Sequence, residues 1–386
     1  MHLSDILFHL GEDRERYFNA VAPPIIQSSN FAFDSLDKIR HAIADEMNQH
    51  VYSRGNNPTV EMVRKKIAAL ANAEDALIFG SGSAACAAAI IAHVNAGDHM
   101  ICVDKPYGWT KALINNFLTR FQVTCTYVDA RRVEDIEEAI QENTTLLLLE
   151  SPNSLTFELQ DLEACAQLAK KHGITSVIDN SAATPYFQKP LDMGIDVSVH
   201  AVTKYLNGHG DVMAGAVCGT KACIQRIFSQ EYMALGAMSS PHDAGLILRG
   251  LRTFELRMEH AQKQGMQIAQ YLSEHPKVEQ VLYPFHPSFP QYELAKKQMS
   301  GAGSLFSFIL KAERIEQAED FFHALQRFTM AASWGGYESL VLPSAAFYKI
   351  PGKPDSEIDW RLMRLYIGLE DAQWLIEDLE RAFAVI

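Results

Sequence analysis

Short apolar runs alternate with helical stretches from about residue 58 to residue 220, and this alternation restricts the possible fold more than any other feature. Helical segments such as 83–95 and 162–172 separate many of these runs. Strands that alternate with helices form βαβ units, so the chain is predicted to be an α/β protein with a mainly parallel sheet. The runs expected to form strands are 76–79, 100–103, 123–128, 145–150, 176–179, 197–201 and 215–218.

The segments on either side of this region follow other patterns. The first 35 residues lack periodicity and predict an extended arm, and helices are expected over 36–48, capped by Ser35, and from Pro58, capped by Asn57. A long helical segment is expected to run from near Leu246 to about His275. We therefore predict an N-terminal arm (1–53), a large domain (54–244) and a smaller C-terminal α+β domain (245–386).

Composition excludes several classes of function. The net charge of −13 argues against nucleic acid or an anionic membrane as the partner. No apolar run approaches the length of a membrane span, and the N-terminus lacks the pattern of a secretory leader. The six cysteines are scattered, which favours buried free thiols in a reducing cytosol over zinc ligation. We expect a cytoplasmic protein without a metal site.

One lysine stands in a setting that suits covalent chemistry. Lys204 follows the mostly apolar run 197–202 and precedes a tight loop at 208–210. Partial burial there is expected to lower its pKa and make the amine nucleophilic. Asp179 ends another predicted strand, where ligand sites of open α/β sheets lie. Together they suit pyridoxal phosphate (PLP), whose aldehyde condenses with an amine and whose ring nitrogen a carboxylate keeps protonated.

Each of these residues has a simpler interpretation. A lone lysine is usually a solvated charge, and an aspartate after a strand often caps a turn. The segment Gly80-Ser81-Gly82-Ser83-Ala84-Ala85 suits a phosphate at a helix N-terminus, but it also fits the dinucleotide pattern. With Asp104 at the end of the next strand as a ribose ligand, an NAD-dependent oxidoreductase is the alternative from another class.

Further candidate residues lie along the chain. Tyr52 and Arg54 could bind a phosphate, or they could be surface residues beside a turn. Tyr107 follows a strand end and could stack on a flat cofactor ring or pack against a wall. Arg364 lies in a mostly apolar strand-like run, where it needs an anion: a substrate carboxylate, or a structural Asp or Glu.

Together, these motifs resemble the Cys/Met-metabolism family of PLP enzymes, which includes cystathionine and methionine lyases. The resemblance covers nearly the whole chain. It implies a fold-type I PLP-dependent enzyme that forms a homotetramer built from dimers with shared active sites. The motifs are Tyr52-Ser53-Arg54, Gly80 to Ala85, Glu150-Ser151-Pro152, Ile178-Asp179-Asn180, Thr203-Lys204-Tyr205, Ser333 to Leu340 and Arg364 to Asp371.

The resemblance also implies roles for individual residues. Lys204 would bond to the cofactor aldehyde and move protons, Asp179 would pair with the ring nitrogen, and Tyr107 would stack on the ring and assist catalysis. Ser333, Trp334 and Arg364 would bind the substrate. The phosphate would be held by Gly82, Ser83 and Thr203, with Tyr52 and Arg54 reaching it from the neighbouring subunit.

Departures from the family pattern bear on the reaction. Ala201 stands where a phosphate-binding serine is frequent, and Asn153-Ser154 reverses the usual order after Glu-Ser-Pro. Ala332 replaces a glutamate of cystathionine γ-enzymes, Trp109 replaces a cysteine of methionine γ-lyases, and Ser333-Trp334-Gly335-Gly336 is similar to bacterial β-lyases. We therefore expect cystathionine β-cleavage to homocysteine, pyruvate and ammonia. Cystathionine γ-lyase, methionine γ-lyase and cystathionine γ-synthase activities remain open, as does a non-catalytic member that only binds partners.

Overall fold

The large sheet has the strand order β1-β7-β6-β5-β4-β2-β3 in the computed structural model, which describes residues 1–386. Only β7 runs against its neighbours, β1 and β6, and the other strands are parallel to one another. The predicted α/β class with a mainly parallel seven-stranded sheet is confirmed. The strands are β1 (Asp75–Phe79), β2 (His99–Val103), β3 (Thr124–Val128), β4 (Thr144–Glu150), β5 (Thr175–Asp179), β6 (Val197–His200) and β7 (Gly215–Gly219).

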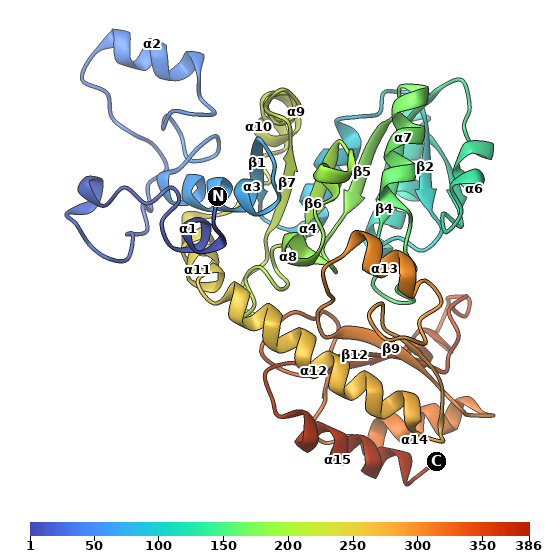
Figure 1. Ribbon diagram of the computed structural model, residues 1–386. Coiled ribbons are helices and arrows are strands. Elements are labelled where there is room, and N and C mark those ends of the chain that lie inside the picture. Colours follow the sequence, from blue (N-terminus) through green and yellow to red (C-terminus); the bar gives the residue numbers. More distant parts are fainter.

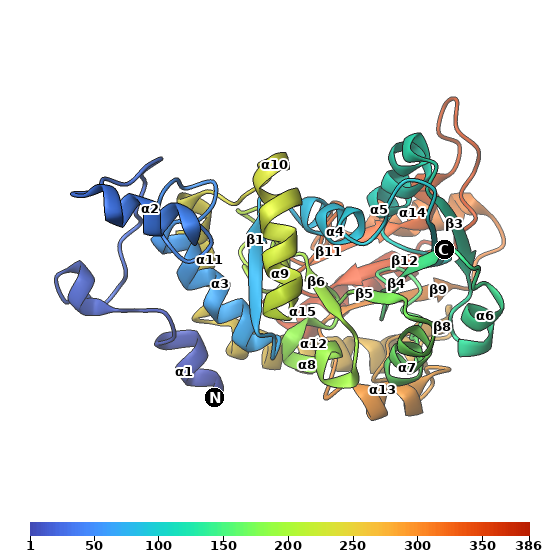
Figure 2. The same cartoon turned by 90° about the horizontal axis from the view of Figure 1, so that it is seen from above.

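Helices cover both faces of this sheet. Figure 2 shows α4 on one face and α7 on the other. Side chains set their ends, since Ser81 caps α4, Asp161 caps α7, and Gly173 ends α7 in the left-handed conformation. The helices before residue 240 are α1 (Leu3–Phe8), α2 (Leu36–Ala44), α3 (Pro58–Leu70), α4 (Gly82–Ile91), α5 (Gly108–Ala112), α6 (Val133–Glu138), α7 (Leu162–His172), α8 (Thr184–Phe187), α9 (Lys221–Ile227) and α10 (Met233–Leu235).

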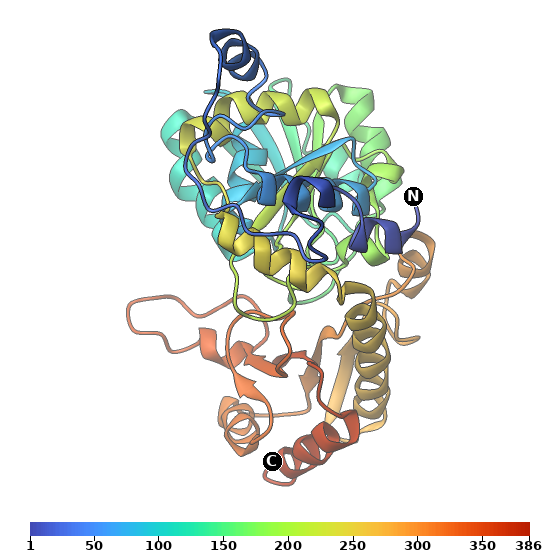
Figure 3. The same cartoon turned by 90° about the vertical axis from the view of Figure 1, so that its left-hand side faces the viewer.

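The two helix caps predicted near the N-terminus are confirmed. Ser35 accepts the N–H of Lys38 at the start of α2, and Asn57 accepts the N–H of Thr59 at the start of α3. Helix α2 ends at Ala44, short of the expected residue 48. Figures 1 and 3 show the segment around α2 standing away from the rest of the chain, which leaves much of its surface uncovered.

The prediction of a single long helix between Leu246 and His275 is wrong. The structure has two helices there, α11 (Pro241–Leu251) and α12 (Phe254–Glu274). The carbonyl of Gly250 accepts hydrogen bonds from Thr253 and from the Arg257 guanidinium, which ends the first helix. Gly250 also packs closely against the Lys204 loop, because a Cβ there would lie 2.2 Å from the carbonyl oxygen of Asn207.

The C-terminal part contains a second sheet, in the order β10-β11-β12-β9-β8. Helices α12, α14 and α15 lie along one side of it (Figure 1). The predicted domain boundaries at residues 53 and 244 remain predictions. The elements are β8 (Val278–Leu282), α13 (Tyr292–Gln298), β9 (Leu305–Leu310), α14 (Ile315–Ala324), β10 (Thr329–Met330), β11 (Leu340–Pro343), β12 (Leu362–Tyr366) and α15 (Ala372–Phe383).

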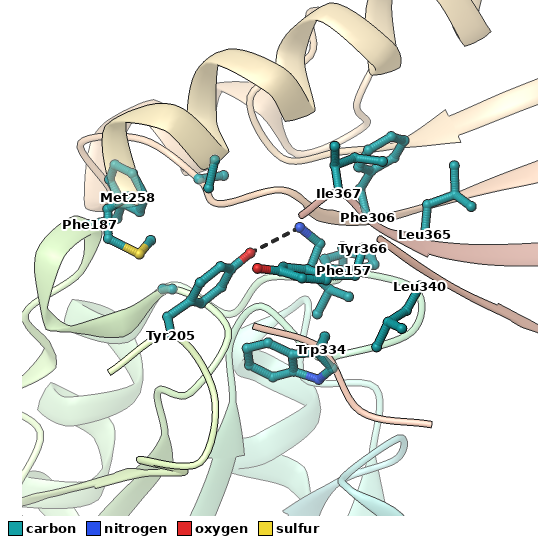
Figure 4. Close-up of a cluster of buried hydrophobic side chains, with 14 of the residues drawn as sticks. Phe157, Phe187, Tyr205, Met258, Phe306, Trp334, Leu340, Leu365, Tyr366 and Ile367 are labelled. Atoms are coloured by element: carbon teal, nitrogen blue, oxygen red, sulfur yellow. Dashed lines mark hydrogen bonds between the residues drawn. The ribbon is translucent and has the colours of Figure 1, made fainter. Parts of the chain in front are cut away.

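A buried aromatic cluster joins the Lys204 loop to the second sheet. Tyr205 is almost fully buried, and its hydroxyl oxygen accepts the backbone N–H groups of Ser304 and Leu305 (Figure 4). Its ring lies 5.4 Å from that of Trp334. Because Tyr205 adjoins Lys204, this packing fixes the lysine loop between the two sheets.

Two features of the structure bear on the expectations about the cysteines and about membrane spans. All six cysteines are free; Cys86, Cys102, Cys165 and Cys218 are buried, while Cys125 and Cys223 are partly exposed. None of the helices combines the length and the apolar character that crossing a membrane would require.

Candidate active site

The loop that carries Lys204 follows β6 and is tied to the start of β7. Thr203 donates its backbone N–H to the Ala214 carbonyl at 3.1 Å, and its hydroxyl oxygen accepts the Ala214 N–H at 2.9 Å. The Lys204 carbonyl accepts the N–H of Gly208 at 2.8 Å, which closes the turn. These bonds direct Lys204 from the carboxyl edge of the parallel strands, the edge at which α/β sheets bind ligands.

The Lys204 amine lies among groups that change its pKa. Its Nζ donates a hydrogen bond to Ser333 Oγ and lies 5.2 Å from the centre of the Trp334 ring. Burial, assisted by the positive charge of Arg364, lowers the pKa of Lys204 to about 8, while Asp179 acts in the opposite direction. With this pKa, roughly a tenth of the amine is neutral, and hence nucleophilic, at pH 7, which is far more than for an ordinary lysine.

Asp179 ends β5 with a defined set of partners. Its Oδ1 accepts the backbone N–H of Ser181 at 2.9 Å and the Ser181 hydroxyl at 2.5 Å, and its Oδ2 lies 3.7 Å from Cys86 Sγ. Burial raises the pKa of Asp179, whereas the bonds from Ser181 lower it. A carboxylate in this position can pair with a protonated ring nitrogen.

Sequence reasoning missed both of these partners of Asp179. Ser181 had a local signal, because a serine two residues after a strand-ending aspartate commonly forms such a turn. Cys86 had none, since its contact with Asp179 spans 93 residues.

The N-terminus of α4 forms a cradle of the kind that binds phosphate. The N–H groups of Gly82 and Ser83 occupy its first turn, where an α-helix provides no intrahelical acceptor. A Cβ at Gly82 would lie 2.9 Å from the Cβ of Ala201, and one at Gly215 would lie 2.3 Å from the Ser81 carbonyl oxygen. The glycines thus let β7 and the Ala201 segment pack closely against the start of α4, and the free N–H groups of its first turn fit a phosphate group.

Arg364 lies on β12 in a mostly buried position. Its guanidinium donates to the carbonyl oxygens of Ser154 at 3.2 Å and Ser333 at 3.4 Å, and it forms no ion pair with a carboxylate. Burial lowers the pKa of Arg364 to about 10. The structural Asp or Glu partner considered above is therefore absent, which leaves this cation available for an anion.

Ser333 links Arg364 to Lys204. Its hydroxyl accepts from Lys204 and its carbonyl accepts from Arg364. Its φ angle of +86° is unusual for a residue with a side chain. The serine thus holds a strained conformation at the point where the hydrogen bonds of Lys204 and Arg364 meet.

Tyr107 and Asn153 lie on neighbouring segments. Tyr107 precedes α5, is 43% exposed, and donates its backbone N–H to Glu150 Oε2 at 2.6 Å. Asn153 is buried, and its Oδ1 accepts the N–H groups of Leu155, Thr156 and Phe157. Asn153 therefore orders a turn.

Tyr52 and Arg54 are not brought to Lys204 within one chain. Both are exposed on the segment before α3, and the Arg54 guanidinium lies 5.6 Å from the centre of the Tyr52 ring. No hydrogen bond or ion pair joins either side chain to the other predicted site residues. Their predicted role at a neighbouring subunit's phosphate remains a prediction.

Comparisons with known proteins agree on one family. The family described as Cys/Met metabolism PLP-dependent enzyme matches residues 4–384. An L-methionine gamma-lyase from Treponema denticola is 39% identical over 381 residues, with 97% of this chain and 94% of that protein covered. A cystathionine gamma-lyase from Homo sapiens is 38% identical over 388 residues, with 99% and 93% covered. The crystal structure of metB from Corynebacterium glutamicum superimposes with a TM-score of 0.93 at 32% identity, over 100% of this chain and 98% of that one.

Proposed function

Because the chain belongs to the Cys/Met metabolism family of PLP-dependent enzymes, we propose that it is a β-lyase that cleaves cystathionine or a similar cysteine thioether. The family, the cofactor PLP and the class of carbon–sulfur lyase, all predicted from the sequence, are confirmed. The NAD-dependent alternative finds no support among these relatives. The β-cleavage itself is the proposal.

In the proposed site, Gly82, Ser83 and Thr203 hold the cofactor phosphate, Tyr107 packs against the ring, and Asp179 pairs with the ring nitrogen. When bound, PLP supplies an aldehyde for an amine and a protonated ring that accepts an electron pair. The position of Gly82 and Ser83 in the first turn of α4 and the partly buried Asp179 carboxylate support this arrangement.

The remaining chemistry comes from side chains of this chain. Arg364 binds the α-carboxylate of the substrate, because it is a mostly buried cation without a carboxylate partner. The neutral Lys204 amine removes the proton from Cα, and Ser333 orients that amine. The thiolate then leaves from Cβ and takes up a proton to give homocysteine, and water hydrolyses the remaining three-carbon amino acid fragment to pyruvate and ammonia.

The observation that carries the proposal is that Lys204 donates to the Ser333 hydroxyl while Arg364 donates to the Ser333 carbonyl, which brings the amine and the free cation to one residue. A β-elimination requires proton removal at Cα only, whereas a γ-elimination also requires it at Cβ. The segment from Ala332 to Gly336 supports β-cleavage, because Ala332 stands where cystathionine γ-enzymes usually carry a glutamate.

The names of the relatives support γ-cleavage as a second candidate. The similar proteins include L-methionine gamma-lyases and cystathionine gamma-lyases. Product analysis with cystathionine separates the two reactions. Homocysteine and pyruvate are expected, and cysteine with 2-oxobutyrate would overturn β-cleavage; release of methanethiol from methionine would identify a methionine γ-lyase.

We also propose that the protein is a cytoplasmic homotetramer built from dimers with shared active sites. The exposed Tyr52 and Arg54 would complete the phosphate site of a neighbouring subunit. Phe18 and Val21, 99% and 80% exposed on the arm, and Leu36 at 70%, support a subunit contact there. Free cysteines are consistent with a reducing compartment.

A further inference from the structure

Glu150 is a buried carboxylate that the proposed reaction does not use. It ends β4 directly opposite Asp179 on β5, and only 7% of the residue is exposed. It forms no ion pair, and burial together with the neighbouring Asp179 raises its pKa. Burying an acid beside another acid is unfavourable unless its oxygens are hydrogen-bonded, so the hydrogen bonds of Glu150 are needed to keep it in this position.

Each oxygen of Glu150 accepts a backbone N–H from a different side of the site. Oε2 accepts the N–H of Tyr107 at 2.6 Å, and Oε1 accepts the N–H of Ser154 at 3.1 Å. The carbonyl of Ser154 in turn accepts from Arg364 Nη1 at 3.2 Å. One carboxylate thus connects Tyr107, on the proposed cofactor side, with the backbone that receives Arg364.

We propose that Glu150 is a positioning residue that sets the cofactor side and the substrate side of this site together. Through Tyr107 it holds the ring that faces the cofactor, and through Ser154 it holds the guanidinium that receives the substrate carboxylate. The inference rests on the proposed roles of Tyr107 and Arg364. It predicts that altering Glu150 weakens two separate binding events.

Two substitutions test this inference. In E150Q the amide oxygen can accept one N–H, but the amide nitrogen cannot accept the other; E150A removes both bonds. Since both hydrogen bonds to backbone N–H groups are lost, we expect the Kd of PLP for the apoenzyme and the KM for cystathionine each to rise about tenfold or more in E150A. E150Q should fall between E150A and the wild type, which keeps the test usable if E150A does not fold.

Asp378 provides the matched control. It is a fully buried carboxylate in α15 that likewise accepts backbone N–H groups, those of Gln326 and Arg327, and it also pairs with Arg381. D378N should lower the melting temperature without changing the cofactor Kd or the KM. It therefore measures what loss of a buried carboxylate does to the fold alone.

A double variant separates positioning from general damage. Because Glu150 is proposed to act on KM through Arg364, E150Q and R364Q should raise KM by less together than the product of their separate effects. The effect of E150Q on the cofactor Kd runs through Tyr107, so it should be the same in the wild-type and R364Q backgrounds. Full multiplicativity on KM would count against the link through Ser154.

The outcomes distinguish this inference from the proposed function. If both Kd and KM rise in the Glu150 variants and stay within twofold of the wild type in D378N, the inference holds. If the Glu150 variants change only the melting temperature, or only one of the two binding constants, it is overturned while the function stands. A wild-type protein that binds no PLP and cleaves no thioether would overturn the function and, with it, the inference.

Discussion

The Lys204 amine, on the loop after β6, donates a hydrogen bond to the hydroxyl of Ser333, which lies 129 residues further along the chain. The Ser333 carbonyl also accepts from Arg364 on β12. The residue proposed as the base is thus hydrogen-bonded to the same serine that accepts from the proposed carboxylate-binding cation. In the proposed function, this serine would connect substrate binding with proton removal.

Removing the Ser333 hydroxyl should slow turnover. In S333A the Lys204 amine loses its acceptor, and we expect kcat to fall roughly threefold to tenfold, with little change in the cofactor Kd. S333G is the matched control, because glycine adopts the observed φ of +86° without strain. Equal losses in S333A and S333G would assign the effect to the hydroxyl, and full activity in S333G would contradict that role.

The lowered pKa of Lys204 predicts how cofactor uptake depends on pH. The neutral amine is the reactive form, so the rate at which the apoenzyme captures PLP should rise with pH to a plateau, with a midpoint near 8 rather than the usual 10.5. R364Q removes a charge that lowers this pKa and should move the midpoint upward, whereas D179N should move it downward. Stopped-flow absorbance measures these rates, and a wild-type midpoint near 10.5 would refute the account.

The hydroxyl of Ser181 should contribute to cofactor affinity. It donates to Asp179 Oδ1 and accepts the N–H of Ala201 at 2.6 Å, just before the Lys204 loop. In S181A the carboxylate loses a partner that lowers its pKa, and the Kd of PLP should rise about tenfold. S181T keeps a hydroxyl and should retain most of the affinity; equal affinity in S181A and wild type would disprove the contribution.

Displacing the loop that packs against the N-terminus of α4 should weaken phosphate binding. The Cβ introduced by G82A would lie 2.9 Å from the Cβ of Ala201, so the loop must shift and cofactor affinity should drop. G108A is the control, because a Cβ at the start of α5 meets no atom within 4 Å. Absorbance titration of both apoenzymes with PLP measures the difference. If G82A binds PLP as tightly as G108A does, the phosphate lies elsewhere.

Mixing two inactive variants tests the shared site. K204A lacks the base and R54A lacks the proposed phosphate contact to the neighbouring subunit. In a mixed dimer, one site receives Lys204 from one chain and Arg54 from the other, so activity should reappear after the two proteins are unfolded and refolded together. Each variant refolded alone is the control. No recovery, with mixed dimers present by mass spectrometry, would show that Arg54 acts within its own chain.

Local patterns in the sequence predicted much of the fold. The seven strands, the Ser35 and Asn57 caps and the course of α7 follow from apolar periodicity and side-chain capping, which depend on neighbouring residues. The break between α11 and α12 was missed because the Arg257 bond to Gly250 competes with helix continuation, and no periodicity reveals that competition.

The contacts within the site could not be predicted from the sequence, because they form only in the tertiary structure. Lys204 and Asp179 were identifiable as chemical candidates at strand ends, but the bonds of Lys204 to Ser333 and of Arg364 to Ser154 span 129 and 210 residues. Glu150 appeared in the sequence only as part of a motif. Its connection to Tyr107 and Ser154 becomes visible only when the sheet places the three segments together.

The most direct test of the account is to locate the covalently bound cofactor. The purified protein is reconstituted with PLP, reduced with borohydride and digested, and the modified peptide is sequenced by mass spectrometry. The account predicts that Lys204 carries the added mass, and that K204A carries none and loses nearly all turnover. Stable modification of another lysine, or unchanged turnover in K204A, would contradict it.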